Sequence, residues 1–206
     1  MSPARSTRSP LPMPSFLPGR RMSTVLALVG LGAAMGLPGV CVAQGERTVV
    51  LVRHAEKAAE PANDPSLSGE GRARAEALLA VLTDARVGAV VVSPFNRTRE
   101  TAAPVLQALG LTAVEVPIGR DLAGHVQSVA DAVRAQPPGA TVLVVGHSNT
   151  IPAIVTALGG PALPDLCDNQ YAVLYVLSLP AEGPARLVTA SYGATDPPDA
   201  SCPTMH

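Results

Sequence analysis

Two histidines and two arginines have the residue types that phosphate chemistry requires, and they come from three separate segments of the chain. Arg53 and His54 are adjacent, whereas Arg97 and His147 lie much further along the sequence. Arginine offers planar, paired donors that match phosphate oxygens, and it does not lose its proton. A neutral imidazole can attack phosphorus and form a phosphohistidine that water then hydrolyses. Because nearby arginine charges disfavour the imidazolium, they would keep the attacking ring neutral.

Each of these residues follows a run of the kind found in a buried strand. The β-branched and apolar runs at 48–53, 88–93 and 141–146 indicate strands that are covered on both faces, as in a parallel sheet. In such a sheet, ligands bind beyond the carboxyl ends of the strands. Taken singly, each polar residue has a plain structural explanation, such as a capped turn or a surface helix position. Their occurrence at three strand ends predicts one cationic pocket.

Helices and strands alternate along the rest of the chain. The pattern predicts helices after Ser68 and at about 96–109, 126–135 and 150–158, and further strands at 111–117, 171–179 and 185–192. This alternation predicts a three-layer α/β/α sandwich with a mainly parallel central sheet, which ends in a pair of neighbouring strands. One domain at 44–206 accounts for all of these elements.

Four motifs resemble, in order and spacing, those of the histidine phosphatase superfamily, the phosphoglycerate mutase-like proteins. They are LVRHAEK at 51–57, LSGEGRARA at 67–75, SPFNRTRET at 93–101 and VVGHSNT at 144–150. The resemblance implies an α/β/α sandwich in which His54 accepts the phosphoryl group. It further implies that Arg53 and Arg97 hold this group and that His147 completes the pocket.

The motif at the nucleophile departs from the common family pattern. Ala55 stands where many members have glycine, and the following Glu56-Lys57 resembles the RHAEK type of small exported members. This departure leaves the chemistry intact but disfavours a mutase. Ser148, next to the second histidine, is a further candidate for binding the phosphate, with capping of the following helix as the alternative.

The general acid that protonates the leaving group has two candidates. The resemblance to the mutase branch points to Asp121, in the loop after the third strand. The same carboxylate could instead cap the next helix, where the helix dipole favours a negative charge. Glu56 is the second candidate, with a salt bridge to Lys57 or to an arginine as its alternative role. Some small members have no evident acid, which suits good leaving groups such as phosphohistidine.

The first 43 residues are typical of an export signal. Residues 1–21 contain four arginines and no acid, an apolar run extends over 25–37, and small residues follow up to Ala43. Because this run is shorter than the roughly 20 residues that span a bilayer, we expect cleavage near Ala43, with an uncleaved anchor as the alternative. The sequence therefore predicts an exported, periplasmic protein without stable membrane insertion after cleavage. The pair Arg20-Arg21 leaves the general and the twin-arginine export routes both open.

Charge and cysteine usage limit the partners and cofactors. Cleavage would remove four arginines and no acid, which lowers the formal net charge from −1 to −5. The mature chain has no basic patch with interleaved aromatics, so we expect no nucleic-acid partner. No Cys/His cluster has zinc spacing, and we expect neither a metal nor another cofactor. Cys167 and Cys202 would meet an oxidising compartment, where they form a disulfide or stay unpaired.

The main interpretation is an exported phosphatase that hydrolyses phosphate monoesters, of a small molecule or an envelope component, through a phosphohistidine on His54. The alternatives are a phosphohistidine protein phosphatase, a mutase, and a domain that binds phosphate or an anionic glycan without turnover. The intact set of histidines and arginines weighs against the binding domain. Specificity is expected from the segments at 58–68, 117–128 and 160–170, which carry no recognisable code. The sequence carries no signal for an oligomeric state.

Overall fold

The computed structural model describes residues 45–119 and 121–198 of the chain. The predicted export signal at 1–43 and Cys202 lie outside these residues, so the predictions that concern them stay predictions. None of the helices in the described ranges is long and apolar enough to cross a membrane.

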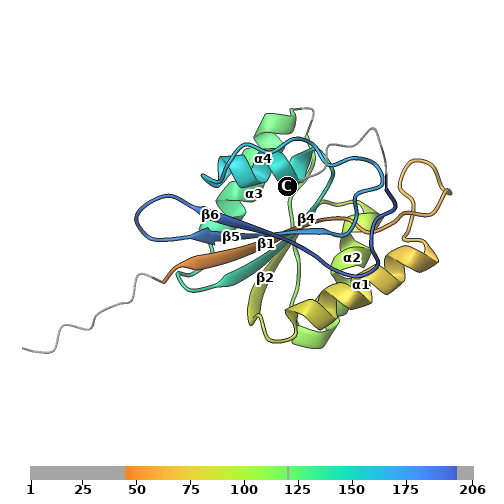
Figure 1. Ribbon diagram of the computed structural model, residues 1–206, viewed down its shortest axis with the longest axis horizontal. Coiled ribbons are helices and arrows are strands. Elements are labelled where there is room, and N and C mark those ends of the chain that lie inside the picture. The colour runs from red at the N-terminus through yellow and green to blue at the C-terminus, as the bar shows by residue number, and fades with distance from the viewer. Residues whose placement is uncertain (1–44, 120, 199–206) are drawn as a thin grey trace, which may run out of the picture. The chain divides into compact units, whose positions relative to one another are not determined.

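The strands of the described residues form one six-stranded sheet with the order β3-β2-β4-β1-β5-β6 (Figure 1). Four strands run parallel to one another: β1 (Arg47–Arg53), β2 (Val87–Val92), β3 (Val114–Glu115) and β4 (Thr141–Gly146). The last two, β5 (Val173–Leu179) and β6 (Arg186–Ser191), form an antiparallel pair, and β5 lies antiparallel beside β1. The mainly parallel sheet and the terminal pair that the sequence predicts are thus confirmed.

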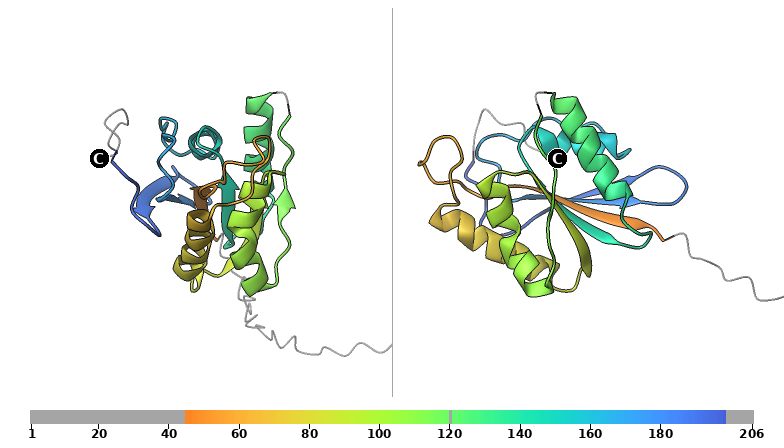
Figure 2. Two further views of the ribbon diagram at one scale, coloured as in Figure 1. Left: turned by 90° about the vertical axis from the view of Figure 1, so that its right-hand side faces the viewer. Right: turned by 180° about the vertical axis from the view of Figure 1, so that it is seen from behind.

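Two helices cover each face of this sheet (Figures 1 and 2). On one face lie α1 (Gly69–Leu82) and α2 (Asn96–Leu109), and on the other α3 (Leu122–Arg134) and α4 (Thr150–Ala157). The predicted three-layer α/β/α sandwich is therefore confirmed.

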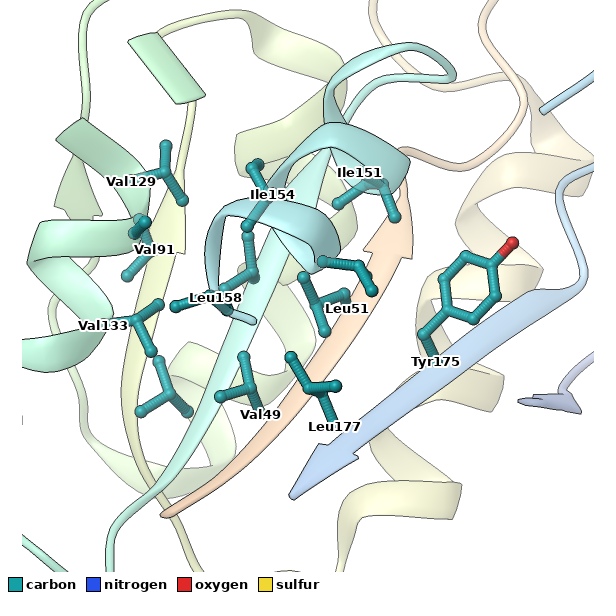
Figure 3. Close-up of a cluster of buried hydrophobic side chains, with 14 of the residues drawn as sticks. Val49, Leu51, Val91, Val129, Val133, Ile151, Ile154, Leu158, Tyr175 and Leu177 are labelled. Carbon is teal, nitrogen blue, oxygen red and sulfur yellow. The ribbon is translucent and has the colours of Figure 1, made fainter. Parts of the chain in front are cut away.

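The side chains of β1 alternate between two aliphatic cores. Val49 and Leu51 pack in the core under α3 and α4, whereas Val50 and Val52 pack in the core under α1 and α2. Figure 3 shows the first of these cores, where Val49 and Leu51 lie beneath α4. Since each fully buried aliphatic side chain contributes about 1.5–3 kcal/mol, the two cores hold the sheet without tryptophan.

Two predicted elements differ from the structure. The predicted strand at 111–117 shortens to the two residues Val114–Glu115, because β3 is an edge strand that pairs only with the last two residues of β2. The predicted helix at 126–135 begins earlier, at Leu122, because Asp121 caps it and Gly124 is accommodated in its first turn. The other elements agree with their predicted ranges to within about two residues.

Candidate active site

Strand register brings the two histidines of the predicted pocket together. The strands β1 and β4 are parallel neighbours, and Arg53 pairs with Gly146 at their carboxyl ends. His54 and His147 follow these two residues, and the backbone N–H of His54 donates to the Gly146 carbonyl at 2.9 Å. The imidazole centroids lie 5.4 Å apart in an edge-to-face arrangement. The two imidazoles thus share one site.

Gly146 and Thr150 shape the turn that carries His147. A Cβ atom on Gly146 would lie 2.8 Å from the Thr150 hydroxyl oxygen and 2.9 Å from the Cδ1 atom of Ile151, so only glycine lets α4 approach this closely. The Thr150 hydroxyl accepts a hydrogen bond from the backbone N–H of His147 at 2.8 Å. This contact fixes the backbone of His147 at the start of α4.

His54 is buried, with 5% of its surface exposed, and its tautomer follows from one contact. Its Nδ1 atom lies 2.8 Å from the carbonyl oxygen of Ala55. Because a carbonyl only accepts hydrogen bonds, Nδ1 carries the proton and Nε2 keeps its lone pair. Burial, together with the positive charges of Arg53 and Arg97, lowers the pKa of this ring to about 3. The ring is therefore neutral at physiological pH, as a nucleophile must be.

Arg53 is buried and held in one orientation by a distant loop. Its Nη1 atom donates to the carbonyls of Cys167 at 2.7 Å, Asp168 at 3.1 Å and Gln170 at 3.4 Å. The guanidinium also lies over the ring of Tyr171, 4.2 Å from its centroid. The Nε atom, by contrast, is one of two buried side-chain nitrogen or oxygen atoms in the described residues that lack a hydrogen-bond partner. The guanidinium of Arg53 is thus fixed by the loop and by Tyr171, with its Nε donor unsatisfied.

Arg97 lies in the first turn of α2 and faces the second histidine. Its Nη2 atom is 3.5 Å from Nδ1 of His147, and its guanidinium lies 4.2 Å from the centroid of the Phe95 ring. Its Nη1 atom is 3.8 Å from a carboxylate oxygen of Asp64. Burial and the charge of Arg53 lower the pKa of Arg97, against the opposite effect of Asp64. Arg97 nevertheless stays a cation, because its ordinary pKa is so high.

His147 contacts a buried hydroxyl on its far side. Its Nε2 atom lies 3.0 Å from the hydroxyl oxygen of Ser93, which is 2% exposed. Burial, with the charges of Arg97, His125 and Arg53, lowers the pKa of His147 to about 4. Both histidines of the site are therefore neutral near pH 7.

These four residues line a pocket of about 360 Å³. The other residues that line it are Lys57, Ala62, Asn63, Pro65, Ser148, Asn149 and Asp168. Ser148 thus lies where it was predicted, and the 58–68 and 160–170 segments contribute to the walls, whereas the 117–128 segment does not. Within the described ranges, no group of three or more His, Cys, Asp or Glu side chains could hold a metal ion.

Asp121, the first candidate acid, caps α3. Its two carboxylate oxygens accept from the backbone N–H groups of Ala123 at 3.1 Å and Gly124 at 3.0 Å. It lines a different depression, together with His125. His125 lies in the first turn of α3 and is buried, and its Nδ1 atom contacts the Pro117 carbonyl at 3.0 Å. The acid role of Asp121 stays a prediction, and its capping role is evident.

Glu56, the second candidate acid, is paired with a buried arginine. Its Oε1 atom lies 2.7 Å from Nη2 of Arg74, and both carboxylate oxygens accept from Nε at 2.9 and 3.0 Å. The same guanidinium donates to the carbonyls of Tyr192 and Ala194 and lies 3.7 Å from Asp196. A wider depression of about 630 Å³ adjoins this cluster. The salt-bridge role of Glu56 is thus present, with Arg74 as its partner.

Three contributors to the site were not predicted. Tyr171 stacks on Arg53, Ser93 contacts His147, and the Thr101 hydroxyl accepts from the backbone N–H of Ala55 at 2.9 Å. Ser93 and Thr101 belong to the SPFNRTRET motif at 93–101, which could have indicated them. Tyr171 carries no such signal, because it opens a predicted strand far from the other motifs.

Cys167, which anchors Arg53 through its carbonyl, is disulfide-bonded. Its partner lies outside the described residues, so the predicted pairing with Cys202 stays a prediction.

Comparison with known proteins gives the same family as the motifs. The model of the histidine phosphatase superfamily (branch 1) matches residues 49–122, which include His54 and Arg97. A structure from Nakamurella multipartitia, provisionally named the phosphohistidine phosphatase SixA, is 27% identical with a TM-score of 0.51, over 73% of this chain and 98% of that one.

Two other solved structures share the fold. A protein histidine phosphatase SixA in complex with tungstate is 21% identical with a TM-score of 0.53, over 70% of this chain and 96% of that one. A mycobacterial glucosyl-3-phosphoglycerate phosphatase is 21% identical with a TM-score of 0.54, over 73% of this chain and all of that one. No curated protein matches the sequence. The motifs, the model match over residues 49–122, the fold and the assembled pocket all agree with the histidine phosphatase superfamily.

Proposed function

We propose that the protein is a phosphatase that hydrolyses phosphate monoesters through a phosphohistidine on Nε2 of His54. One observation carries this proposal. The Ala55 carbonyl holds the Nδ1 proton of His54 at 2.8 Å, which leaves the Nε2 lone pair in a pocket lined by Arg53, Arg97 and His147. A neutral nucleophile among fixed cationic donors is the arrangement that phosphoryl transfer needs.

The reaction then takes two displacements. In the first, Nε2 of His54 attacks phosphorus, the bond from phosphorus to the ester oxygen breaks, and the ester oxygen takes up a proton and leaves as the alcohol. In the second, water attacks phosphorus, the nitrogen–phosphorus bond breaks, and inorganic phosphate leaves while His54 is regenerated. Arg97 and Arg53, which line the pocket, would stabilise the charge on the non-bridging oxygens in both transition states.

The proposal is tested by assaying the protein on a panel of phosphate monoesters beside His54→Ala and a control, His125→Asn. The control replaces a second buried histidine outside the pocket, and its side-chain amide can still donate to the Pro117 carbonyl. We expect the control to keep its activity and His54→Ala to lose it. Wild-type protein quenched during turnover should carry phosphate that is acid-labile and base-stable. Equal turnover by wild type and His54→Ala would refute the assignment.

A phosphohistidine phosphatase is the second candidate, and the carboxylates favour it. Asp121 is engaged as a helix cap, Glu56 is paired with Arg74, and Asp168 is the carboxylate among the residues that line the pocket. An imidazole leaves more readily than an alkoxide, so phosphohistidine needs less help from an acid. The likeness to the Nakamurella protein supports the same candidate.

Leaving-group dependence separates the two candidates. Aryl phosphates, alkyl phosphates and a phosphohistidine peptide would be compared at one pH. Poor turnover of alkyl phosphates beside rapid turnover of the peptide would favour the phosphohistidine phosphatase. Comparable turnover of all three would favour the monoesterase and require an acid.

We further propose that the protein is exported to the periplasm and cleaved after Ala43. The disulfide at Cys167 supports this proposal, because such bonds persist in oxidising compartments. Cell fractionation followed by N-terminal sequencing tests it, with Gln44 expected as the first residue of the periplasmic form. An intact N-terminus in the cytoplasmic fraction would overturn it.

A further inference from the structure

A chain of two buried hydroxyls lies behind His147, on the side away from Arg97. The Ser93 hydroxyl oxygen is 3.0 Å from Nε2 of His147 and 2.9 Å from the hydroxyl oxygen of Thr98. The Thr98 hydroxyl is also 2.8 Å from the Ser93 carbonyl and 2.9 Å from the Phe95 carbonyl. Ser93 and Thr98 are 2% and 0% exposed. The chain is therefore enclosed by protein and ends on backbone.

With Arg97 beside His147, one arrangement of protons gives every hydrogen-bonding atom of His147, Ser93 and Thr98 a partner. A guanidinium only donates, so Nδ1 of His147, 3.5 Å from Nη2 of Arg97, must accept. The ring proton is then on Nε2 and is donated to Ser93. Ser93 in turn donates to Thr98, whose own proton goes to a backbone carbonyl.

A bound phosphoryl group requires the opposite arrangement. The unprotonated oxygens of a phosphoryl dianion only accept, so Nδ1 of His147 must carry the proton to contact one of them. In the neutral ring, Nε2 then has a bare lone pair in a buried position. The Ser93 hydroxyl can turn to donate to this lone pair while its oxygen accepts from Thr98. The same two hydroxyls thus complete both arrangements, with no change in net charge.

We propose that Ser93 is a positioning residue for the phosphoryl transfer, which holds neutral His147 in the tautomer that donates from Nδ1 to a phosphoryl oxygen. This inference rests on the proposed function, because it assumes that His147 contacts the phosphoryl group. Its support beyond the contacts is that burial and the Arg97 charge keep the pKa of His147 at about 4. The ring is then neutral near pH 7, and what must be selected is the position of its proton.

The decisive measurement is the tautomer of His147 in the wild-type protein. Protein labelled with ¹⁵N-histidine would be examined by NMR at pH 7 with saturating inorganic phosphate, and His147 assigned by comparison with His147→Gln. We expect Nδ1 to be protonated and Nε2 bare. A bare Nδ1, or a ring with protons on both nitrogens, would overturn the proposal without any need for a Ser93 variant.

The kinetic test compares Ser93→Ala, Thr98→Val and the control Ser128→Ala on an aryl phosphate. Ser128 donates to the Gly124 carbonyl on α3, outside the pocket. We expect kcat to fall by roughly 10–100-fold in Ser93→Ala, the range for losing the hydrogen bond from His147 to the charged phosphoryl group, and to fall less in Thr98→Val. The control should match wild type, and the labelled Ser93→Ala protein should lose the Nδ1–H tautomer.

The outcomes separate this inference from the function on which it rests. If His54→Ala abolishes turnover but Ser93→Ala keeps the wild-type kcat, the role of Ser93 is wrong and the phosphatase assignment stands. If His54→Ala retains turnover, the phosphatase mechanism itself is wrong. If Ser93→Ala does not fold, the kcat of Thr98→Val and the NMR spectrum of the wild-type protein still test the role of Ser93.

Discussion

The two histidines of the pocket should make the free energy of unfolding fall as the pH drops below neutral. The pKa of His54 is about 3 and that of His147 about 4 in the folded protein, chiefly because both rings are buried. An unfolded histidine titrates near 6.5. Between these values the unfolded chain binds protons that the folded chain does not, so acid favours unfolding. This contribution is fully present above about pH 6.5 and is lost as the pH falls toward the folded pKa values.

The size of the effect at pH 5 follows from the unfolded pKa alone. At that pH both rings are still neutral in the folded protein, while nearly every unfolded histidine is protonated. A gap of about 1.5 pH units at 1.36 kcal/mol per unit gives about 2 kcal/mol for each ring. Together His54 and His147 should remove about 4 kcal/mol between pH 7.5 and pH 5, a large part of the 5–15 kcal/mol typical of a domain.

Urea unfolding at pH 7.5 and pH 5 measures this loss. Glutamine is neutral throughout this range, so His54→Gln and His147→Gln should each reduce the loss by about 2 kcal/mol, and the double variant by about 4 kcal/mol. Carboxylates titrate alike in all four proteins, and their effect cancels in the comparison. An equal loss in the wild type and the double variant would show that the folded rings are not held neutral.

Three further predictions concern the supports of the site. Replacing Arg74 with Met leaves the Glu56 carboxylate without its buried partner, and urea unfolding should show a loss of about 3–5 kcal/mol. In Gly146→Ala, the new Cβ would press on the Thr150 hydroxyl, and we expect the free energy of unfolding to fall by about 1–3 kcal/mol together with a lower kcat. Removing the cap in Asp121→Ala should lower the free energy of unfolding by about 1 kcal/mol, whereas that of Asp121→Asn should stay within a few tenths of a kcal/mol of the wild-type value. If Asp121→Asn slows alkyl phosphates more than aryl phosphates, the aspartate is also the acid; equal slowing would remove it from that role.

The sequence was sufficient to predict that His54 and His147 meet, because parallel strands that are neighbours in a sheet end at the same edge. The runs before Arg53-His54 and before His147 are both buried strands, and neighbouring parallel strands end at the same edge. The polar residues that follow these strands must therefore lie close together, whatever the conformation of the loops. The same argument applies to Arg97, because it lies at the start of α2, shortly after the end of β2, and β2 is the neighbour of β4 on the side away from β1.

The sequence could not predict which group satisfies each polar side chain of the pocket. Asp121 fits both a helix cap and an acid, because the same carboxylate at the same position serves either role. Glu56 has several arginines within reach in the sequence, and only the packing of α1 selects Arg74. The loop carbonyls that hold Arg53 come from residues more than 110 positions away. Because every residue has a backbone carbonyl, no residue type in the sequence indicates these contacts.

The buried guanidinium of Arg74 connects the segment after His54 with the chain segment that holds Tyr171. Arg74 holds Glu56, which follows the nucleophile by two residues, and it also lies 3.7 Å from Asp196 near the end of the described chain. Asp196 in turn accepts from the backbone N–H groups of Tyr171 and of the residue after it, at 2.9–3.0 Å. Tyr171 stacks on Arg53, so Arg53 and the loop after His54 share one support. Because donors that are fixed before the reaction stabilise a transition state without reorganising, this cluster should act on kcat from outside the pocket.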